Sequence, residues 1–132
     1  MTGNEFLILA GKLATSADEA SLRSAVSRAY YGAFHLATQF LEDIERPVPK
    51  NAHAHVYVAR QLQRSGQADA CRAGSLLGDL QSKRIKADYR LDDSRIGTSA
   101  FARLYVEWAS EIQTALIKCQ IEPVRSEIQA GL

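Results

Sequence analysis

A proline-free segment from Ser16 to Ile44 constrains the fold of this chain more than any other feature. Ser16 and Glu19 form a capping-box pattern at its start, and Pro47 and Pro49 follow its end, where a helix cannot continue. Between these limits the apolar residues recur at the period of an α-helix. The predicted core face of this long helix comprises Leu22, Val26, Ala29, Ala33, Ala37, Phe40 and Ile44.

The rest of the chain shows the same helical period, and no segment alternates at the period of a strand. A short first helix is indicated by the apolar spacing of Phe6, Leu9, Ala10 and Leu13. Asn51 is predicted to cap a third helix that ends at Ser65-Gly66, and a fourth helix is expected from about Gln67 to Tyr89. Its apolar side is expected to be Leu76, Leu77, Leu80 and Ile85. Thr98 is predicted to cap the last helix, whose stripe is Phe101, Leu104, Tyr105, Trp108, Ile112, Ala115, Leu116 and Cys119. Long helices with short connections predict an all-α fold, an antiparallel bundle of four to five helices.

Length and charge limit the possible functions. The 132 residues form one predicted domain (1–132), with a core over about 5–120 and a tail over 121–132 that we expect to fray or to contact a partner. The net charge of +1 removes any global electrostatic argument for nucleic acid binding. There is no signal peptide or membrane span, so a cytoplasmic protein without a membrane partner is expected. P-loop, dinucleotide-binding, zinc-protease and nucleophile-elbow motifs are missing, which disfavours those enzyme classes.

A narrow polar line runs along the long helix, opposite its core face. Its members lie within a small angle of one another on the helical wheel: Ser24, Arg28, Gly32, His35 and Gln39. Arg28 and His35 are two turns apart and project the same way, roughly 10 Å apart along the axis. Gly32 lies between them and is predicted to leave a notch, which Tyr31 flanks. A cation, an imidazole and a gap between them are suited to holding a phosphodiester.

The residue types on this line predict phosphodiester chemistry. The imidazole of His35 titrates near neutrality, so it can take a proton from a ribose 2′-hydroxyl or give one to the leaving oxygen. The guanidinium of Arg28 can bind two phosphoryl oxygens and stabilise the charge of the transition state. Neither step needs a metal ion or a cofactor. One histidine cannot easily act as both acid and base, which favours a homodimer with two such pairs facing one cleft.

Structural alternatives exist for each of these features. A polar line opposite a core face is typical of any solvated helix, and a mid-helix glycine can simply let another helix approach. Lys83, Lys86 and Arg90 form a short basic strip, with Arg72 earlier on the same line, that could follow an RNA backbone. A solvated face balanced by Asp79 and Asp88 explains this strip better. His53 and His55 point in nearly opposite directions if they are helical, which is wrong for one metal ion. We therefore expect no metal site.

Two motifs resemble those of a known family. The stretch Arg23-Ser-Ala-Val-Ser-Arg-Ala-Tyr-Tyr-Gly-Ala-Phe-His35 is similar to the signature helix of small prokaryotic HEPN-domain proteins. The later Lys83-Arg-Ile-Lys-Ala-Asp-Tyr89 resembles the end of that family's fourth helix. The resemblance covers about residues 5–120 and implies a helical bundle that commonly forms a homodimer.

The resemblance also implies an activity. Many HEPN proteins are metal-independent ribonucleases with an Arg-x(4–6)-His motif, and Arg28 and His35 enclose six residues. Such proteins are often toxins that pair with a nucleotidyltransferase antitoxin. The first hypothesis is therefore an endoribonuclease in which Arg28 and His35 are catalytic, and Ser24, Tyr31, Gly32, Gln39, Lys83 and Lys86 bind RNA. The second is a non-catalytic HEPN module that binds a nucleotide or a partner protein, which the near-neutral charge and Ala29 after Arg28 favour.

Overall fold

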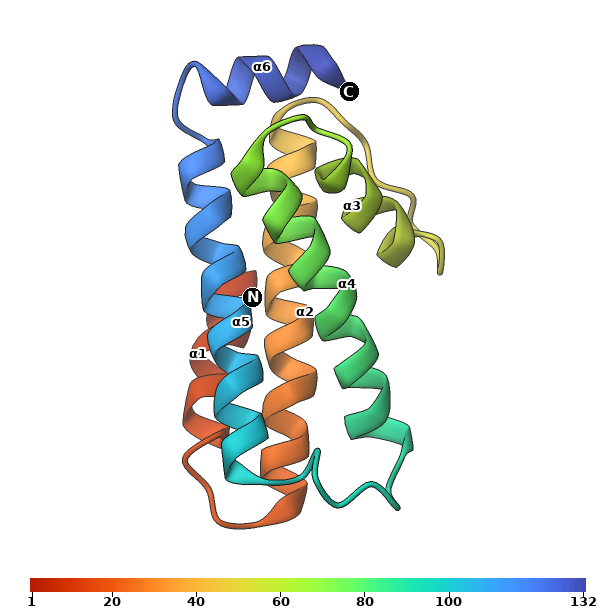
Figure 1. Cartoon of the computed structure of the whole chain (residues 1–132), viewed down its shortest axis with the longest axis vertical. Coiled ribbons are helices and arrows are strands. Elements are labelled where there is room, and N and C mark those ends of the chain that lie inside the picture. The colour runs from red at the N-terminus through yellow and green to blue at the C-terminus, as the bar shows by residue number, and fades with distance from the viewer.

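The longest helix, α2 (Glu19–Asp43), runs through the centre of the molecule in the computed structural model, which describes residues 1–132 (Figure 1). It packs against α1 (Gly3–Leu13), α4 (Ala68–Tyr89) and α5 (Ser99–Cys119). The shorter α3 (Ala54–Gln63) lies on α4, and α6 (Val124–Gly131) crosses one end of the bundle. The chain has no strand, which confirms the all-α prediction. None of the six helices combines the length and the apolar character that crossing a bilayer requires.

The start of α2 differs from the predicted capping box. Asp18, not Ser16, is the N-cap, and its carboxylate accepts a hydrogen bond from the backbone N–H of Ser21 at 2.9 Å. The Ser16 hydroxyl donates to the other oxygen of the same carboxylate. Ser16 therefore supports the cap from outside the helix, and the carboxylate of Asp18, two residues later, makes the bond to the helix itself.

The core face predicted for α2 is confirmed. Its seven residues are all buried, and together they form the wall on which the other helices pack: Leu22, Val26, Ala29, Ala33, Ala37, Phe40 and Ile44. Three of them are alanines, so neighbouring helix backbones can approach α2 closely. Tyr30 is also fully buried, which places an aromatic hydroxyl inside the bundle.

The buried side of α1 agrees only in part with the predicted one, since Ala10 alone of the four predicted residues is fully buried. Gly3, Leu7 and Ala10 face the bundle, whereas Leu9 is exposed and Phe6 is only half-buried. The reason is the close crossing of α1 and α2 at two glycines. A β-carbon added at Gly32 would lie 2.9 Å from the backbone oxygen of Gly3 and 2.6 Å from Cδ2 of Leu7. Two helices can be this close only where neither carries a side chain, so the small residues determine which side of α1 turns inward.

This crossing predicts that alanine at Gly32 destabilises the fold, whereas alanine at a glycine outside the crossing does not. Gly32→Ala should lower the free energy of unfolding by about 1–3 kcal/mol, because the new methyl group forces α1 away from α2. The matched control is Gly11→Ala in α1, where an added β-carbon meets nothing within 4 Å. That control should be neutral or stabilising by up to about 1 kcal/mol, since alanine favours a helix over glycine. Urea unfolding of both variants checks the prediction, and an equal effect at the two positions would contradict it.

The later helices follow the predicted order with local corrections. Asn51 does not cap α3; its side chain accepts a hydrogen bond from the backbone of His53, which is the N-cap residue. On α4, Leu77 and Leu80 are buried as predicted, but Ile85 is exposed. Thr98 caps α5 as predicted, and its hydroxyl oxygen accepts a hydrogen bond from the backbone of Phe101.

The tail expected over 121–132 is a sixth helix, one more than the predicted four to five. Ile128 of α6 is completely buried against the end of the bundle. The Arg46 side chain donates a hydrogen bond at 2.7 Å to the backbone oxygen of Leu132 and a second one to that of Gln129. One buried isoleucine and these backbone contacts hold α6 in place, so the segment is not frayed.

Candidate functional site

Arg28, Tyr31 and His35 lie on one side of α2, in the order that the helical period predicts. The guanidinium carbon of Arg28 lies 5.4 Å from the centre of the Tyr31 ring, and the rings of Tyr31 and His35 are 6.5 Å apart. Arg28 takes part in none of the ion pairs of the structure, so its charge is available to an anion. His35 is exposed and Arg28 is half-buried. The three side chains therefore form one surface with an unpaired cation and an accessible imidazole.

Phe6 of α1 joins Arg28 to His35, and nothing in the sequence pattern of α2 predicts it. The Arg28 guanidinium carbon lies 5.3 Å from the centre of the Phe6 ring, and the His35 ring stacks on Phe6 at a centroid distance of 5.3 Å. Contacts of this kind restrict the rotamers of both polar side chains without neutralising either one. Phe6 thus orients the two residues that carry the proposed chemistry.

The notch predicted at Gly32 is not open to solvent. Gly32 is buried, and the backbone of Gly3 and the side chain of Leu7 occupy the space in front of it. The glycine therefore permits the helix crossing that brings Phe6 to Arg28 and His35. Its contribution to the site is indirect, through the position of α1.

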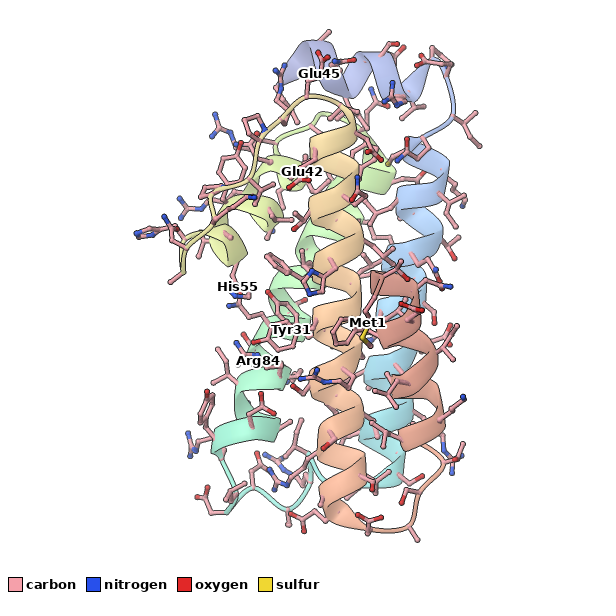
Figure 2. All side chains as sticks on the ribbon, turned by 180° about the vertical axis from the view of Figure 1, so that it is seen from behind. Met1, Tyr31, Glu42, Glu45, His55 and Arg84 are labelled. Atoms are coloured by element: carbon pink, nitrogen blue, oxygen red, sulfur yellow. The ribbon has the colours of Figure 1, made fainter.

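A second group of polar residues adjoins the first from the other side of Tyr31. Figure 2 shows Tyr31 of α2, His55 of α3 and Arg84 of α4 gathered on the same side of the molecule. The guanidinium carbon of Arg84 lies 5.4 Å from the centre of the Tyr31 ring and 5.6 Å from that of Tyr30. The Tyr31 ring therefore contacts two guanidinium groups, one from α2 and one from α4.

Asp88 holds Arg84 in this position. The two residues form the intrahelical ion pair that their spacing on α4 predicts, with 3.6 Å between Nη1 of Arg84 and Oδ2 of Asp88. The same carboxylate oxygen accepts a hydrogen bond from the Ser27 hydroxyl of α2 at 3.2 Å. Asp88 therefore ties α4 to α2 beside the site, while its neighbour Tyr89 is largely exposed.

His55 is the second imidazole of the site. Its ring stacks on Phe34 at a centroid distance of 4.6 Å, and its Nδ1 is hydrogen-bonded to the hydroxyl of Tyr30. Burial raises the pKa of Tyr30, so this hydroxyl keeps its proton at neutral pH. The hydrogen bond occupies Nδ1 of His55 and leaves Nε2 as the free nitrogen of the ring.

Both histidines have a lowered pKa. Partial burial lowers the pKa of His35, and the charge of Arg28 adds to the effect. Partial burial also lowers the pKa of His55, with further contributions from the charges of Arg84 and His35. At neutral pH both imidazoles are therefore mainly uncharged, the state in which a histidine accepts a proton.

A groove of about 460 Å³ connects the two histidines along the surface of the molecule. Residues of α2, of α3 and of the preceding connection line it, among them Phe34, His35, Thr38, Glu42, Lys50 and His55. The groove lies beside His35 toward α3, and not over Gly32 where the sequence predicted the cleft. An extended ligand that lies in it passes both imidazoles.

The remaining predicted site residues are divided by the structure. Gln39 lines a second pocket together with His35, and its amide donates to Asp43 at 2.8 Å. Ser24 is exposed near the start of α2 and contacts neither pocket. Lys83 and Lys86 line a separate pocket with residues of α5 and of the preceding connection. Within it the Lys83 ammonium lies 5.8 Å from the centre of the Tyr105 ring. The structure therefore brings together Arg28, Tyr31 and His35, but not the two lysines.

Two of the four residues of the basic strip on α4 pair with acidic residues. The partners differ from the expected ones, which were neighbours on α4. Arg72 pairs with Glu111 of α5 at 3.1 Å, and Arg90 pairs with Asp92 at 3.6 Å. Lys83 and Lys86, the two lysines of the strip, take part in none of the ion pairs.

The lowered pKa values of the two histidines predict how stability depends on pH. The unfolded chain takes up protons near pH 6.5, the ordinary value for histidine, whereas His35 and His55 in the folded chain resist protonation. The free energy of unfolding should therefore fall as the pH drops below about 6.5. Urea unfolding at pH 5.5 and 7.5 tests this, and the double variant His35→Gln/His55→Gln should depend less on pH. An unchanged pH dependence in that variant would contradict the assignment.

Comparisons with known proteins give no relative for this chain. A scan against protein-family models, a search of curated proteins and a search of solved structures each returned no match.

Proposed function

We propose that this protein is a metal-independent endoribonuclease of the HEPN type that its motifs resemble. The observation that carries the proposal is the shared contact of Arg28 and His35 with Phe6, which fixes an unpaired guanidinium and an exposed imidazole on one surface. In this arrangement Arg28 binds the phosphodiester through its non-bridging oxygens. His35 takes the proton of the neighbouring 2′-hydroxyl, and the resulting oxygen attacks phosphorus.

The charge state of His35 supports its role as a base. Because burial and Arg28 lower its pKa, the imidazole is mainly neutral at pH 7 and can accept a proton. Arg28 meanwhile keeps its positive charge, which stabilises the additional negative charge on the phosphoryl oxygens in the transition state. The products would be a 2′,3′-cyclic phosphate and a free 5′-hydroxyl.

Ala29, the residue that favours the non-catalytic interpretation in sequence, has little bearing on the site. Its side chain is completely buried in the core, on the side of α2 away from the Arg28 surface. A polar residue at this position would face the interior and not a substrate. The apolar side chain is explained by packing.

The test of the proposal is incubation of the purified protein with end-labelled total RNA and tRNA in the presence of EDTA. We expect cleavage, with products that carry 2′,3′-cyclic phosphate ends. A phosphatase should remove the terminal phosphate of these products only after mild acid has opened the cyclic phosphate. The separate variants Arg28→Ala and Arg28→Lys should both cleave poorly, because lysine lacks the bidentate fork. Absence of cleavage by the parent protein, or cleavage that survives both substitutions, would contradict the proposal.

Nucleotide binding without cleavage is the second candidate function. The observation in its favour is the set of aromatic rings around two arginines, with Tyr31 in contact with both Arg28 and Arg84. Rings and guanidinium groups of this kind suit a nucleobase and its phosphate as well as they suit RNA.

The biological setting that we propose follows from the motif resemblance alone. It is a toxin or defence module in which the protein forms a homodimer and a nucleotidyltransferase serves as the antitoxin. The mass of the protein in solution tests the homodimer, and co-purification with the product of a neighbouring nucleotidyltransferase gene tests the pairing.

A further inference from the structure

The groove beside α2 contains two imidazoles from the same chain, although the motif of the proposed ribonuclease requires only one. His35 and His55 both line it, and both rings lie against Phe34, at centroid distances of 5.7 Å and 4.6 Å. His35 comes from the middle of α2, whereas His55 comes from the first turn of α3. Their placement therefore depends on how α3 packs beside α2.

Transesterification of RNA needs two proton transfers at opposite sides of phosphorus. One group removes the proton of the attacking 2′-hydroxyl, and another supplies a proton to the departing 5′-oxygen. A single histidine performs both steps only by moving its proton between two distant atoms. Two histidines beside the same phosphate divide the task.

We propose that His55 is the second proton-transfer residue of the ribonuclease site and acts as the general acid opposite His35. His35 takes the 2′-hydroxyl proton as the bond between the 2′-oxygen and phosphorus forms. The step uses the protonated form of His55, which is the minor form at neutral pH. In that form His55 gives its Nε2 proton to the 5′-oxygen as the bond between phosphorus and that oxygen breaks. The products are the cyclic phosphate and a 5′-hydroxyl, and both histidines then regain their starting states by proton exchange with water. This inference rests on the proposed function.

The surroundings of His55 fit a side chain held in one orientation. Tyr30 is fully buried, and its hydroxyl fixes Nδ1, so rotation of the imidazole breaks that hydrogen bond. Phe34 covers one face of the ring. Such fixed geometry is typical of proton-transfer groups, which lose activity when they are displaced by about 1 Å. His53, two residues earlier, is exposed and has no comparable side-chain contacts.

A comparison of two leaving groups tests the role of His55. The first substrate is a labelled oligoribonucleotide, whose 5′-oxygen needs a proton in order to leave. The second is the set of 4-nitrophenyl esters of the four nucleoside 3′-phosphates, whose nitrophenolate leaves without one. The variants are His55→Phe, which keeps a ring against Phe34, and His55→Gln, with His35→Ala for comparison and His53→Gln as the matched control. Circular dichroism confirms that each variant is folded.

We expect both His55 variants to cleave the oligoribonucleotide about 10²–10⁴-fold more slowly than the parent and the nitrophenyl esters within about 10-fold of it. His35→Ala should lose activity on both substrates, and His53→Gln on neither. Parental cleavage of the oligoribonucleotide by the His55 variants, or equal losses on the two substrates, would overturn the role of His55 and leave the proposed function intact. A parent protein that cleaves neither substrate would overturn both.

Discussion

Replacing His35 with alanine is expected to slow RNA cleavage by about 10²–10⁴-fold, the usual contribution of a positioned acid–base group. The loss should appear in the rate at saturating RNA, because His35 acts on a proton and contributes little to holding the substrate. The side chain is exposed on the surface of α2, so its removal should leave the fold intact. Single-turnover cleavage at saturating enzyme measures this rate directly.

A matched histidine on α3 provides the control for this loss. His53→Ala removes an exposed imidazole outside the groove and should cleave at the parental rate. If His35→Ala also kept the parental rate, the base would have to be another group, and the assignment of the site to this side of α2 would be wrong.

The largest stability effect is expected for Arg23→Ala. This buried side chain binds the C-terminal end of α4: its Nη1 donates to the backbone oxygens of Lys86, Ala87 and Arg90, and its Nη2 donates to that of Asp93 at 2.6 Å. Its Nε donates to Glu19 at 2.7 Å. Loss of the guanidinium leaves the carbonyls of Ala87 and Asp93 without a partner, whereas those of Lys86 and Arg90 keep a backbone donor. The free energy of unfolding should fall by about 3–5 kcal/mol.

Two further variants distinguish the hydrogen bonds of Arg23 from a general effect of losing a positive charge. Arg103→Ala removes an exposed arginine of α5 and should change stability by less than about 0.5 kcal/mol. Arg23→Lys keeps the charge but cannot donate in all these directions at once, so it should recover only part of the loss. Urea unfolding distinguishes the cases, and an Arg23→Ala variant as stable as Arg103→Ala would contradict the account.

The spacing of apolar residues predicted the central part of the fold, because on a long helix this spacing identifies the side that is buried. The seven core residues of α2 are apolar, and their spacing alone identified the buried side. The same reasoning failed in part for α1: Ala10 is buried as predicted, but Gly3 and Leu7 are buried as well and Leu9 is exposed. The close approach of the α1 and α2 backbones at Gly3 and Gly32 determines how these two helices pack. A pattern of apolar residues does not reveal such a close approach.

The candidate site could be predicted only as far as it lies on one helix. Arg28, Tyr31 and His35 are related by spacing within α2, whereas Phe6 and His55 reach the site through the packing of α1 and α3. Phe6 looked like a core residue in sequence, and His55 carried no signal beyond being a histidine. The capping pattern at Ser16 was wrong because the helix begins later than that pattern predicts, and Asp18 caps it by accepting a hydrogen bond from the backbone N–H of Ser21.

The tail shows how a proline can be misread. Pro123 separates α5 from the last residues, and the short mixed segment that follows predicted fraying. Ile128 and the two bonds from Arg46 to the chain end instead hold α6 on the bundle. A single apolar residue and distant backbone acceptors leave almost no pattern in sequence.

The central claim is that Arg28 holds an RNA phosphate beside which His35 transfers a proton, and NMR titration with an uncleavable RNA tests it most directly. The probe is a short oligoribonucleotide with 2′-O-methyl groups, added to the parent protein and to Arg28→Ala. We predict that the imidazole resonances of His35 shift and that its pKa rises on binding, because a phosphate beside the ring favours the charged form. Arg28→Ala should weaken binding by about 10-fold or more at low salt. Unperturbed His35 resonances at saturating RNA, or binding of the same strength without Arg28, would contradict the claim.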